Sequence, residues 1–121
     1  MGQSDTPPAK SKPPGAAARL AAAERVCEML HDQTDGSRRY RASVEEAYIW
    51  SKRRMEAQRD VENARGGDRV AALQAHLQRM RDLEAQYAGF FKDRAASRLE
   101  LESTHFYVAE AEELLARERA K

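Results

Sequence analysis

The fold is decided by the segment Ala64-Arg65-Gly66-Gly67-Asp68, which lies between two long helix-forming stretches. Glycine at the end of a helix readily adopts the left-handed conformation that terminates it. Asp68 is a good N-cap residue for a following helix, because its side chain can accept hydrogen bonds from free backbone N–H groups. The segment therefore predicts a short turn, and a turn this short joins two antiparallel helices.

The stretch after this turn has the most regular apolar spacing in the chain. Its apolar residues are three or four positions apart, so they lie along one side of a helix and form a coiled-coil-like seam. These residues are Val70, Leu73, Leu77, Met80, Leu83, Tyr87 and Phe90. The pattern predicts a helix over residues 68–93.

Two capping boxes mark where two further helices begin. They are Ser43-Val44-Glu45-Glu46 and Ser97-Arg98-Leu99-Glu100. In a Ser-x-x-Glu box the serine oxygen accepts a hydrogen bond from a free backbone N–H, and the glutamate side chain accepts one from the serine N–H. The boxes predict helices over residues 43–65 and 97–119.

Composition divides the chain into two parts. All four prolines lie in residues 1–15, so we expect this segment to be a disordered arm. Residues 16–121 contain no proline and much alanine, glutamate and arginine, which favour helix. This part begins with a stripe of Leu20, Val26 and Leu30, which predicts a helix over residues 17–34. We therefore expect an arm followed by a single all-α domain of four helices.

The charges are nearly balanced, with 21 Lys and Arg against 20 Asp and Glu. Because opposite signs are interspersed, they predict exposed helix faces with ion pairs. The basic clusters Arg38-Arg39-Tyr40-Arg41 and Lys52-Arg53-Arg54 are flanked by acidic residues. Nucleic-acid binding needs a clustered basic surface, so the composition argues against a nucleic-acid partner.

The spacing of the two capping boxes indicates an internal repeat. The two cap serines, Ser43 and Ser97, are 54 residues apart, and the alanine before each and the glutamate after each also align. If the helices on each side of the Gly-Gly turn stack end to end, the chain is one antiparallel helical hairpin of two broken, coiled-coil-like arms. If the chain folds back at the caps, it is a compact four-helix bundle. The short connections slightly favour the hairpin, and both arrangements stay open.

Three stretches resemble a family of uncharacterised helical bacterial proteins that is well represented in planctomycetes. They are Ala47–Ala57 (AYIWSKRRMEA), Arg69–Met80 (RVAALQAHLQRM) and Glu110–Ala116 (EAEELLA). Those proteins are similar to the helical hairpin repeats of TolC-like outer-membrane efflux proteins, where a glycine lies three residues before each Ser or Thr cap. In this chain the two glycine positions are Tyr40 and Arg94. The resemblance implies a helical hairpin over roughly residues 23–117 and says little about transport.

Two Glu-x-x-His motifs are the candidate metal ligands: Glu28 with His31, and Glu102 with His105. This spacing places a carboxylate and an imidazole on one side of a helix, as in dinuclear carboxylate-bridged metal bundles. In a hairpin folded at the Gly-Gly turn, position 31 is level with position 102, and position 28 with position 105. The alternative function is therefore a helical bundle that binds a divalent metal such as iron, manganese or zinc.

The ligand set of this metal site is incomplete. A ferritin-like site needs two further glutamates from the other helices, and Glu46 and Glu84 are only loose candidates. If no metal binds, both Glu-x-x-His motifs are solvated charge pairs on helix surfaces, and no cofactor is expected.

The main functional expectation is helix-mediated protein–protein interaction, in a structural or adaptor protein that forms homo-oligomers. Phe90-Phe91 and Phe106-Tyr107 are adjacent pairs, and adjacent residues cannot both face one narrow helical seam. Some aromatic side chains must then be exposed, which favours a partner surface. Cys27 has only His31 one turn along the helix and no third catalytic group, so no catalytic residue is predicted.

The sequence also predicts a cytoplasmic protein. No stretch approaches the roughly 18 apolar residues of a membrane span. The N-terminus lacks the apolar core of a secretory signal.

Overall fold

The computed structural model describes residues 15–33 and 42–121, and these residues form four α-helices and no strand. The helices are α1 (Ala16–Gln33), α2 (Val44–Arg65), α3 (Arg69–Lys92) and α4 (Arg98–Arg119). The all-α fold class is therefore confirmed, and each helix begins and ends within two residues of its predicted bounds. The expected N-terminal arm lies outside the described residues, apart from Gly15.

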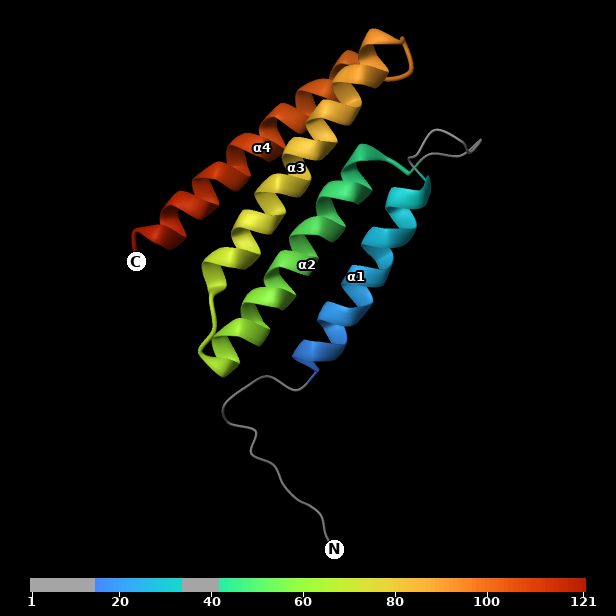
Figure 1. Cartoon of the computed structure of the whole chain (residues 1–121). Helices are drawn as coiled ribbons and strands as arrows, with labels where there is room; N and C mark the ends of the chain where they lie inside the picture. The colour runs from blue at the N-terminus through green and yellow to red at the C-terminus, as the bar shows by residue number, and fades with distance from the viewer. Residues whose placement is uncertain (1–14, 34–41) are drawn as a thin grey trace, which may run out of the picture.

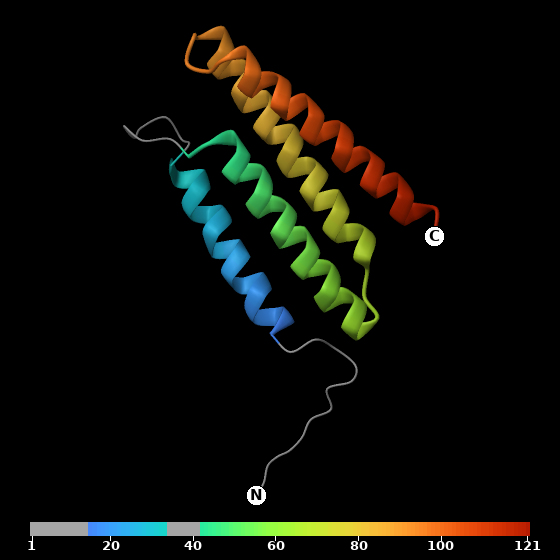
Figure 2. The ribbon, with the colours of Figure 1, turned by 180° about the vertical axis from the view of Figure 1, so that it is seen from behind.

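The four helices form an open row in chain order. Helix α1 packs on α2, α2 on α3, and α3 on α4, with a smaller contact between α2 and α4. Figures 1 and 2 show the same order from opposite sides, with α1 and α4 at the two edges. Of the two arrangements left open, the chain thus folds back and does not stack its helices end to end. Folding back buries more apolar surface, because α3 then packs on both α2 and α4.

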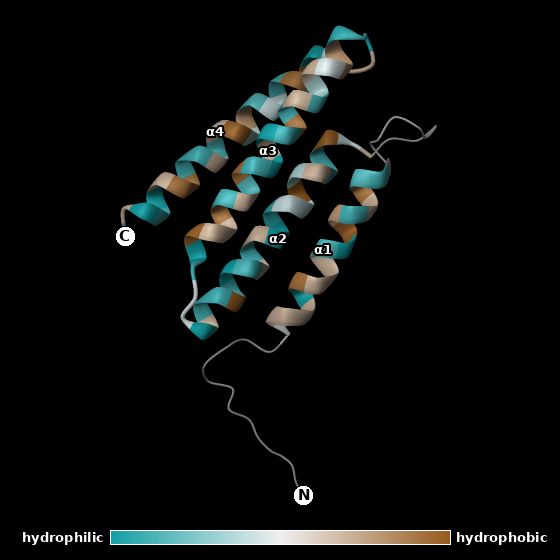
Figure 3. Cartoon of the chain, viewed as in Figure 1, coloured by the Kyte–Doolittle hydropathy of each residue, from teal (hydrophilic) through white to brown (hydrophobic). Residues whose placement is uncertain are grey.

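The core lies around α3, which has the longest series of buried residues. They are Ala72, Leu73, His76, Leu77, Met80, Leu83 and Tyr87. They pack against Val44 and Met55 of α2 and against Ala111 and Leu115 of α4. Figure 3 shows hydrophobic and hydrophilic segments alternating along each helix, as expected where one side of a helix is buried.

The Gly-Gly turn has the predicted conformation. Gly66 ends α2 with a φ of 72°, in the left-handed region. Asp68 then caps α3, because its Oδ1 atom accepts hydrogen bonds from Val70 N at 2.9 Å and Ala71 N at 3.3 Å. The turn therefore reverses the chain between α2 and α3.

The α3–α4 connection contains a residue in a conformation that favours glycine. Arg94 has a φ of 64°, and the Ala95 N–H donates to Phe90 O at 2.6 Å, which closes the end of α3 as a Schellman motif does. Arg94 is one of the two positions where the resembled repeat has glycine. The other, Tyr40, lies outside the described residues.

Both predicted capping boxes are present. Ser43 Oγ accepts from Glu46 N, and Ser97 Oγ accepts from Glu100 N, each at 3.0 Å. Each glutamate side chain accepts in return from the backbone N–H of its serine. The two boxes therefore satisfy N–H groups that would otherwise be left without partners at the starts of α2 and α4.

Replacing Ser97 with alanine is expected to lower the free energy of unfolding by about 1 kcal/mol, because the cap hydrogen bond at the start of α4 is lost. Urea denaturation followed by circular dichroism measures this change. Ser103→Ala is the matched control, because Ser103 lies within α4, where its Oγ donates to Leu99 O and caps no helix; a change of this kind should stay within about 0.5 kcal/mol. Equal effects of the two substitutions would contradict the capping role of Ser97.

The adjacent aromatic pairs divide between core and surface, as predicted. Phe90 and Tyr107 pack against the core, whereas Phe91 and Phe106 are exposed. Within the described ranges, none of the helices has both the length and the hydropathy that crossing a membrane requires.

Candidate functional site

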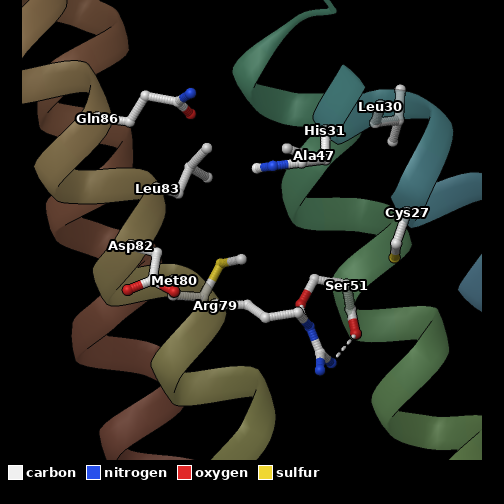
Figure 4. Close-up of a pocket in the computed structure, with 10 residues that line it drawn as sticks. All are labelled: Cys27, Leu30, His31, Ala47, Ser51, Arg79, Met80, Asp82, Leu83 and Gln86. Atoms are coloured by element: carbon white, nitrogen blue, oxygen red, sulfur yellow. Dashed lines mark hydrogen bonds between the residues drawn. The ribbon is translucent and has the colours of Figure 1, made fainter. Parts of the chain in front are cut away.

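The candidate site is a cavity of about 270 Å³ between α1, α2 and α3. It exists because α1 and α3 pack on different sides of α2, so that a groove remains between them. Its apolar wall is formed by Leu30 of α1, Ala47 of α2, and Met80 and Leu83 of α3 (Figure 4). The cavity is therefore walled by three separate helices.

The polar end of the cavity is formed by Arg79 and Ser51. Arg79 extends from α3 towards α2 (Figure 4), where its Nε donates to Ser51 Oγ at 2.7 Å and its Nη2 donates to Ser51 O at 3.1 Å. Burial, followed by the neighbouring charge of Arg54, lowers the pKa of Arg79 to about 10. The guanidinium is therefore still charged at neutral pH, although it is partly removed from water.

His76 lies behind Ser51 and completes a chain of three polar side chains. Its Nδ1 atom is 2.8 Å from Ser51 Oγ, and its ring is fully buried. Burial, followed by the charge of Arg79, lowers the His76 pKa to about 4, so the imidazole is neutral at pH 7. Because Arg79 donates to Ser51 Oγ, the serine hydroxyl can donate its own proton to His76 Nδ1. The His76 proton is then on Nε2, which has no hydrogen-bond partner among the described residues.

This serine–histidine pair is not arranged for nucleophilic catalysis. Ser51 is only 2% exposed, and its hydroxyl oxygen already accepts a hydrogen bond from Arg79. A nucleophile needs access to its substrate and a base that can take up its proton. Burial opposes the protonation of His76, so His76 is a poor base here. The arrangement instead holds Arg79 in one position at the end of the cavity.

A second polar cluster joins α2 to α4 on the other side of α2. Tyr48 donates to Glu110 at 2.7 Å, and Lys52 donates to Glu110 at 3.2 Å and to the Tyr48 hydroxyl at 3.3 Å. The ring of Tyr107 stacks on that of Tyr48, with centroids 4.0 Å apart. Burial, then the hydrogen bond to Glu110, raises the pKa of Tyr48. Burial lowers the pKa of Lys52, but its hydrogen bonds to Tyr48 and Glu110 together outweigh burial, so the pKa of Lys52 is raised as well.

A third cluster holds the C-terminal end of α4. Glu118 is almost fully buried and accepts ion pairs from Arg59 of α2 at 3.2 Å and Arg69 of α3 at 3.4 Å. The two clusters give α4 a defined position against α2 and α3 and leave its outer surface uncovered.

The predicted metal ligands are not brought together. Glu28 and His31 are exposed on α1, and Glu102 and His105 are exposed on α4, at opposite edges of the row (Figure 1). Glu102 accepts an ion pair from Arg98 at 3.2 Å. His105 Nδ1 is instead 2.7 Å from Glu84 Oε2, so one of the loosely suggested glutamates does contact a predicted ligand.

The arrangement of the described helices does not support the four-residue metal site. No group of three or more His, Cys, Asp or Glu side chains in the described part of the chain is placed to hold a metal ion. The pairing of positions 31 and 102 assumed a hairpin in which α1 packs beside α4. Because the chain folds back, α1 packs on α2 instead.

The Arg79–Ser51–His76 chain was not predicted from the sequence. One signal was present: His76 lies three residues after Leu73 and four before Met80, within the apolar stripe of α3. A histidine at such a position is expected to be buried and to need a hydrogen-bond partner. Its partner Ser51 lies on another helix, and no sequence pattern pointed to it.

No family model, curated protein or solved structure matches this chain. The resemblance to the planctomycete helical proteins and to TolC-like hairpin repeats therefore stays a prediction.

Proposed function

We propose that this is a structural or adaptor protein that acts through helix-mediated protein–protein interaction, and that it self-associates through the outer surface of α4. The observation that carries this proposal is the exposure of two large apolar side chains on that helix. Leu99 is 76% exposed and Phe106 is 58% exposed. They are seven residues apart and therefore lie on the same side of the helix.

The position of α4 in the row supports a helix partner. As an edge helix it packs on α3 and to a small extent on α2, so its outer side has no neighbour among the described residues. Exposed apolar side chains gathered on one face are typical of interaction surfaces. A further helix packed there would continue the row of helices.

The charges of α4 favour a second copy of this chain as the partner. The outer surface carries Glu102 paired with Arg98 near its start, and Glu113 paired with Arg117 near its end. An antiparallel pair of α4 helices that brings Leu99 of one copy against Phe106 of the other joins two surfaces that each carry both signs of charge. A two-fold pairing of this kind uses the same surface twice and closes as a dimer.

Light scattering coupled to size-exclusion chromatography tests this proposal. We expect the wild-type protein to be dimeric at tens of micromolar, and the double substitution Leu99→Glu with Phe106→Glu to be monomeric, because two carboxylates then replace the apolar contact. Met29→Glu is the matched control, since Met29 is 56% exposed on α1, at the other edge of the row, and this variant should remain dimeric.

Two results would contradict the proposal. A monomeric wild-type protein at that concentration would exclude self-association as its function. A double variant that is still dimeric would place the interface on a surface other than α4. Circular dichroism of each variant would show that its helices are retained.

A further inference from the structure

We infer that the cavity between α1, α2 and α3 binds a small monocarboxylate that has a short apolar body, with Arg79 holding the carboxylate. This site is separate from the proposed self-association surface, because no residue of α4 lines the cavity. The inference therefore does not depend on the proposed function.

The positive charge of Arg79 has no partner of opposite sign among the described residues. Both of its hydrogen bonds go to neutral oxygen atoms of Ser51. No Asp or Glu of the described residues lies within ion-pair distance of its guanidinium. A partly buried charge is normally neutralised by a partner of opposite sign, so an anion in the cavity would complete the site.

Nearby acidic residues do not supply that partner. Asp82 lines the same cavity but accepts a hydrogen bond from Gln78 at 2.9 Å, and Figure 4 shows the Arg79 side chain extending away from it. Glu24 of α1 is near enough to raise the Arg79 pKa slightly but forms no ion pair with it. Arg54, in contrast, adds a second positive charge nearby.

The guanidinium of Arg79 is also held in a fixed position. Nε and Nη2 are both used by Ser51, and the serine is held in turn by His76. The remaining guanidinium atom, Nη1, forms no hydrogen bond to a described residue and can donate to an anion. Arginine held in this way suits a carboxylate, which accepts charge-assisted hydrogen bonds from it.

The remaining walls define the rest of the ligand. Beyond Arg79 and Ser51 the cavity is lined by Leu30, Ala47, Met80 and Leu83, which suit an aliphatic or aromatic body, and also by Cys27, His31, Asp82 and Gln86. Its volume of about 270 Å³ is at the lower end of small-molecule sites, which span about 300–1,000 Å³. An α-helix about 10 Å across would be too wide for it, so a small acid is favoured over a partner helix.

A nuclear magnetic resonance titration of the isotope-labelled full chain tests this inference, with hexanoate as the probe and 1-hexanol as its neutral counterpart. We expect hexanoate to shift the backbone amide signals of Ser51, Arg79 and Leu83 in a saturable way at pH 7. We expect it to bind about tenfold more tightly than 1-hexanol, because only the carboxylate can pair with Arg79.

Substitution of Arg79 then tests whether its side chain is the group that binds the carboxylate of hexanoate. Arg79→Gln should reduce hexanoate affinity to that of 1-hexanol and leave 1-hexanol binding unchanged. Arg81→Gln is the matched control, because Arg81 is exposed on the same helix and pairs with Glu112; this variant should bind hexanoate as the wild-type protein does.

Equal affinities of the wild-type protein for hexanoate and 1-hexanol would overturn the inference, as would the absence of saturable shifts around the cavity. The comparison of the two probes needs no variant, so it decides the question even if Arg79→Gln does not fold. An Arg79→Gln variant that folds and binds hexanoate normally would show that another group holds the carboxylate.

Discussion

Replacing Tyr87 with alanine is expected to lower the free energy of unfolding by about 3–5 kcal/mol, the largest stability effect of any substitution considered. Tyr87 has no exposed surface. Its ring packs edge-on against Phe90, with centroids 5.2 Å apart, and its hydroxyl donates to Ala42 O at 3.5 Å. The side chain thereby joins the end of α3 to the start of α2, and its removal leaves a cavity that the surrounding helices can fill only in part.

Urea denaturation of Tyr87→Ala and Tyr87→Phe separates packing from hydrogen bonding. The phenylalanine variant keeps the ring and removes the hydroxyl with its long hydrogen bond to Ala42 O, so we expect it to cost about 1 kcal/mol. A loss of less than about 1 kcal/mol in the alanine variant would show that this part of the core is not tightly packed. A phenylalanine variant as unstable as the alanine variant would assign the stability to the hydroxyl group instead.

Lowering the pH from 7 to 5 is expected to reduce the free energy of unfolding by about 2 kcal/mol through His76 alone. The His76 pKa is about 4 in the folded protein and about 6.5 when the chain is unfolded. Between these values the unfolded state binds a proton that the folded state does not. The stability that neutral His76 contributes is therefore complete above about pH 6.5 and is lost as the pH falls towards 4.

The slope of stability against pH, measured by urea denaturation at intervals between pH 7 and pH 5, tests this expectation. His76→Gln should have a much flatter slope than the wild-type protein, whatever its stability at pH 7, because glutamine does not titrate. His105→Gln is the matched control, since His105 is exposed beside Glu84 and should leave most of the slope unchanged. Equal slopes in the wild-type protein and His76→Gln would show that the pKa of His76 is the same in the folded and the unfolded chain, and would contradict the expectation.

Much of the local structure could be predicted from the sequence. The four helices, the Gly66 turn, the Asp68 cap and the two capping boxes all depend on residues within a few positions of one another. The interactions that form them are local, so a short window of sequence contains both partners of each hydrogen bond. That some of the paired aromatic side chains are exposed also followed from sequence, because adjacent residues on a helix point in different directions; the structure shows that these are Phe91 and Phe106.

The prediction of a metal site shows where local patterns stop being informative. Each Glu-x-x-His motif does place its two side chains on one helix, as expected. Bringing the two motifs together required α1 to pack beside α4, and helical periodicity says nothing about which helix is the neighbour. The balance between end-to-end stacking and folding back depends on the total apolar surface buried, to which every helix contributes.

The sequence by itself determined that this protein consists of amphipathic helices, where those helices begin and end, and that some aromatic side chains are exposed. Only the tertiary structure decided that the helices form an open row, and that this row leaves a cavity between α1 and α3. The contacts of Arg79 with Ser51 and of Ser51 with His76 span 28 and 25 residues. Side chains so far apart in the sequence meet only when whole helices pack against each other. Which helices pack together depends on the apolar surface buried over the entire chain, and no local spacing of residues encodes that choice.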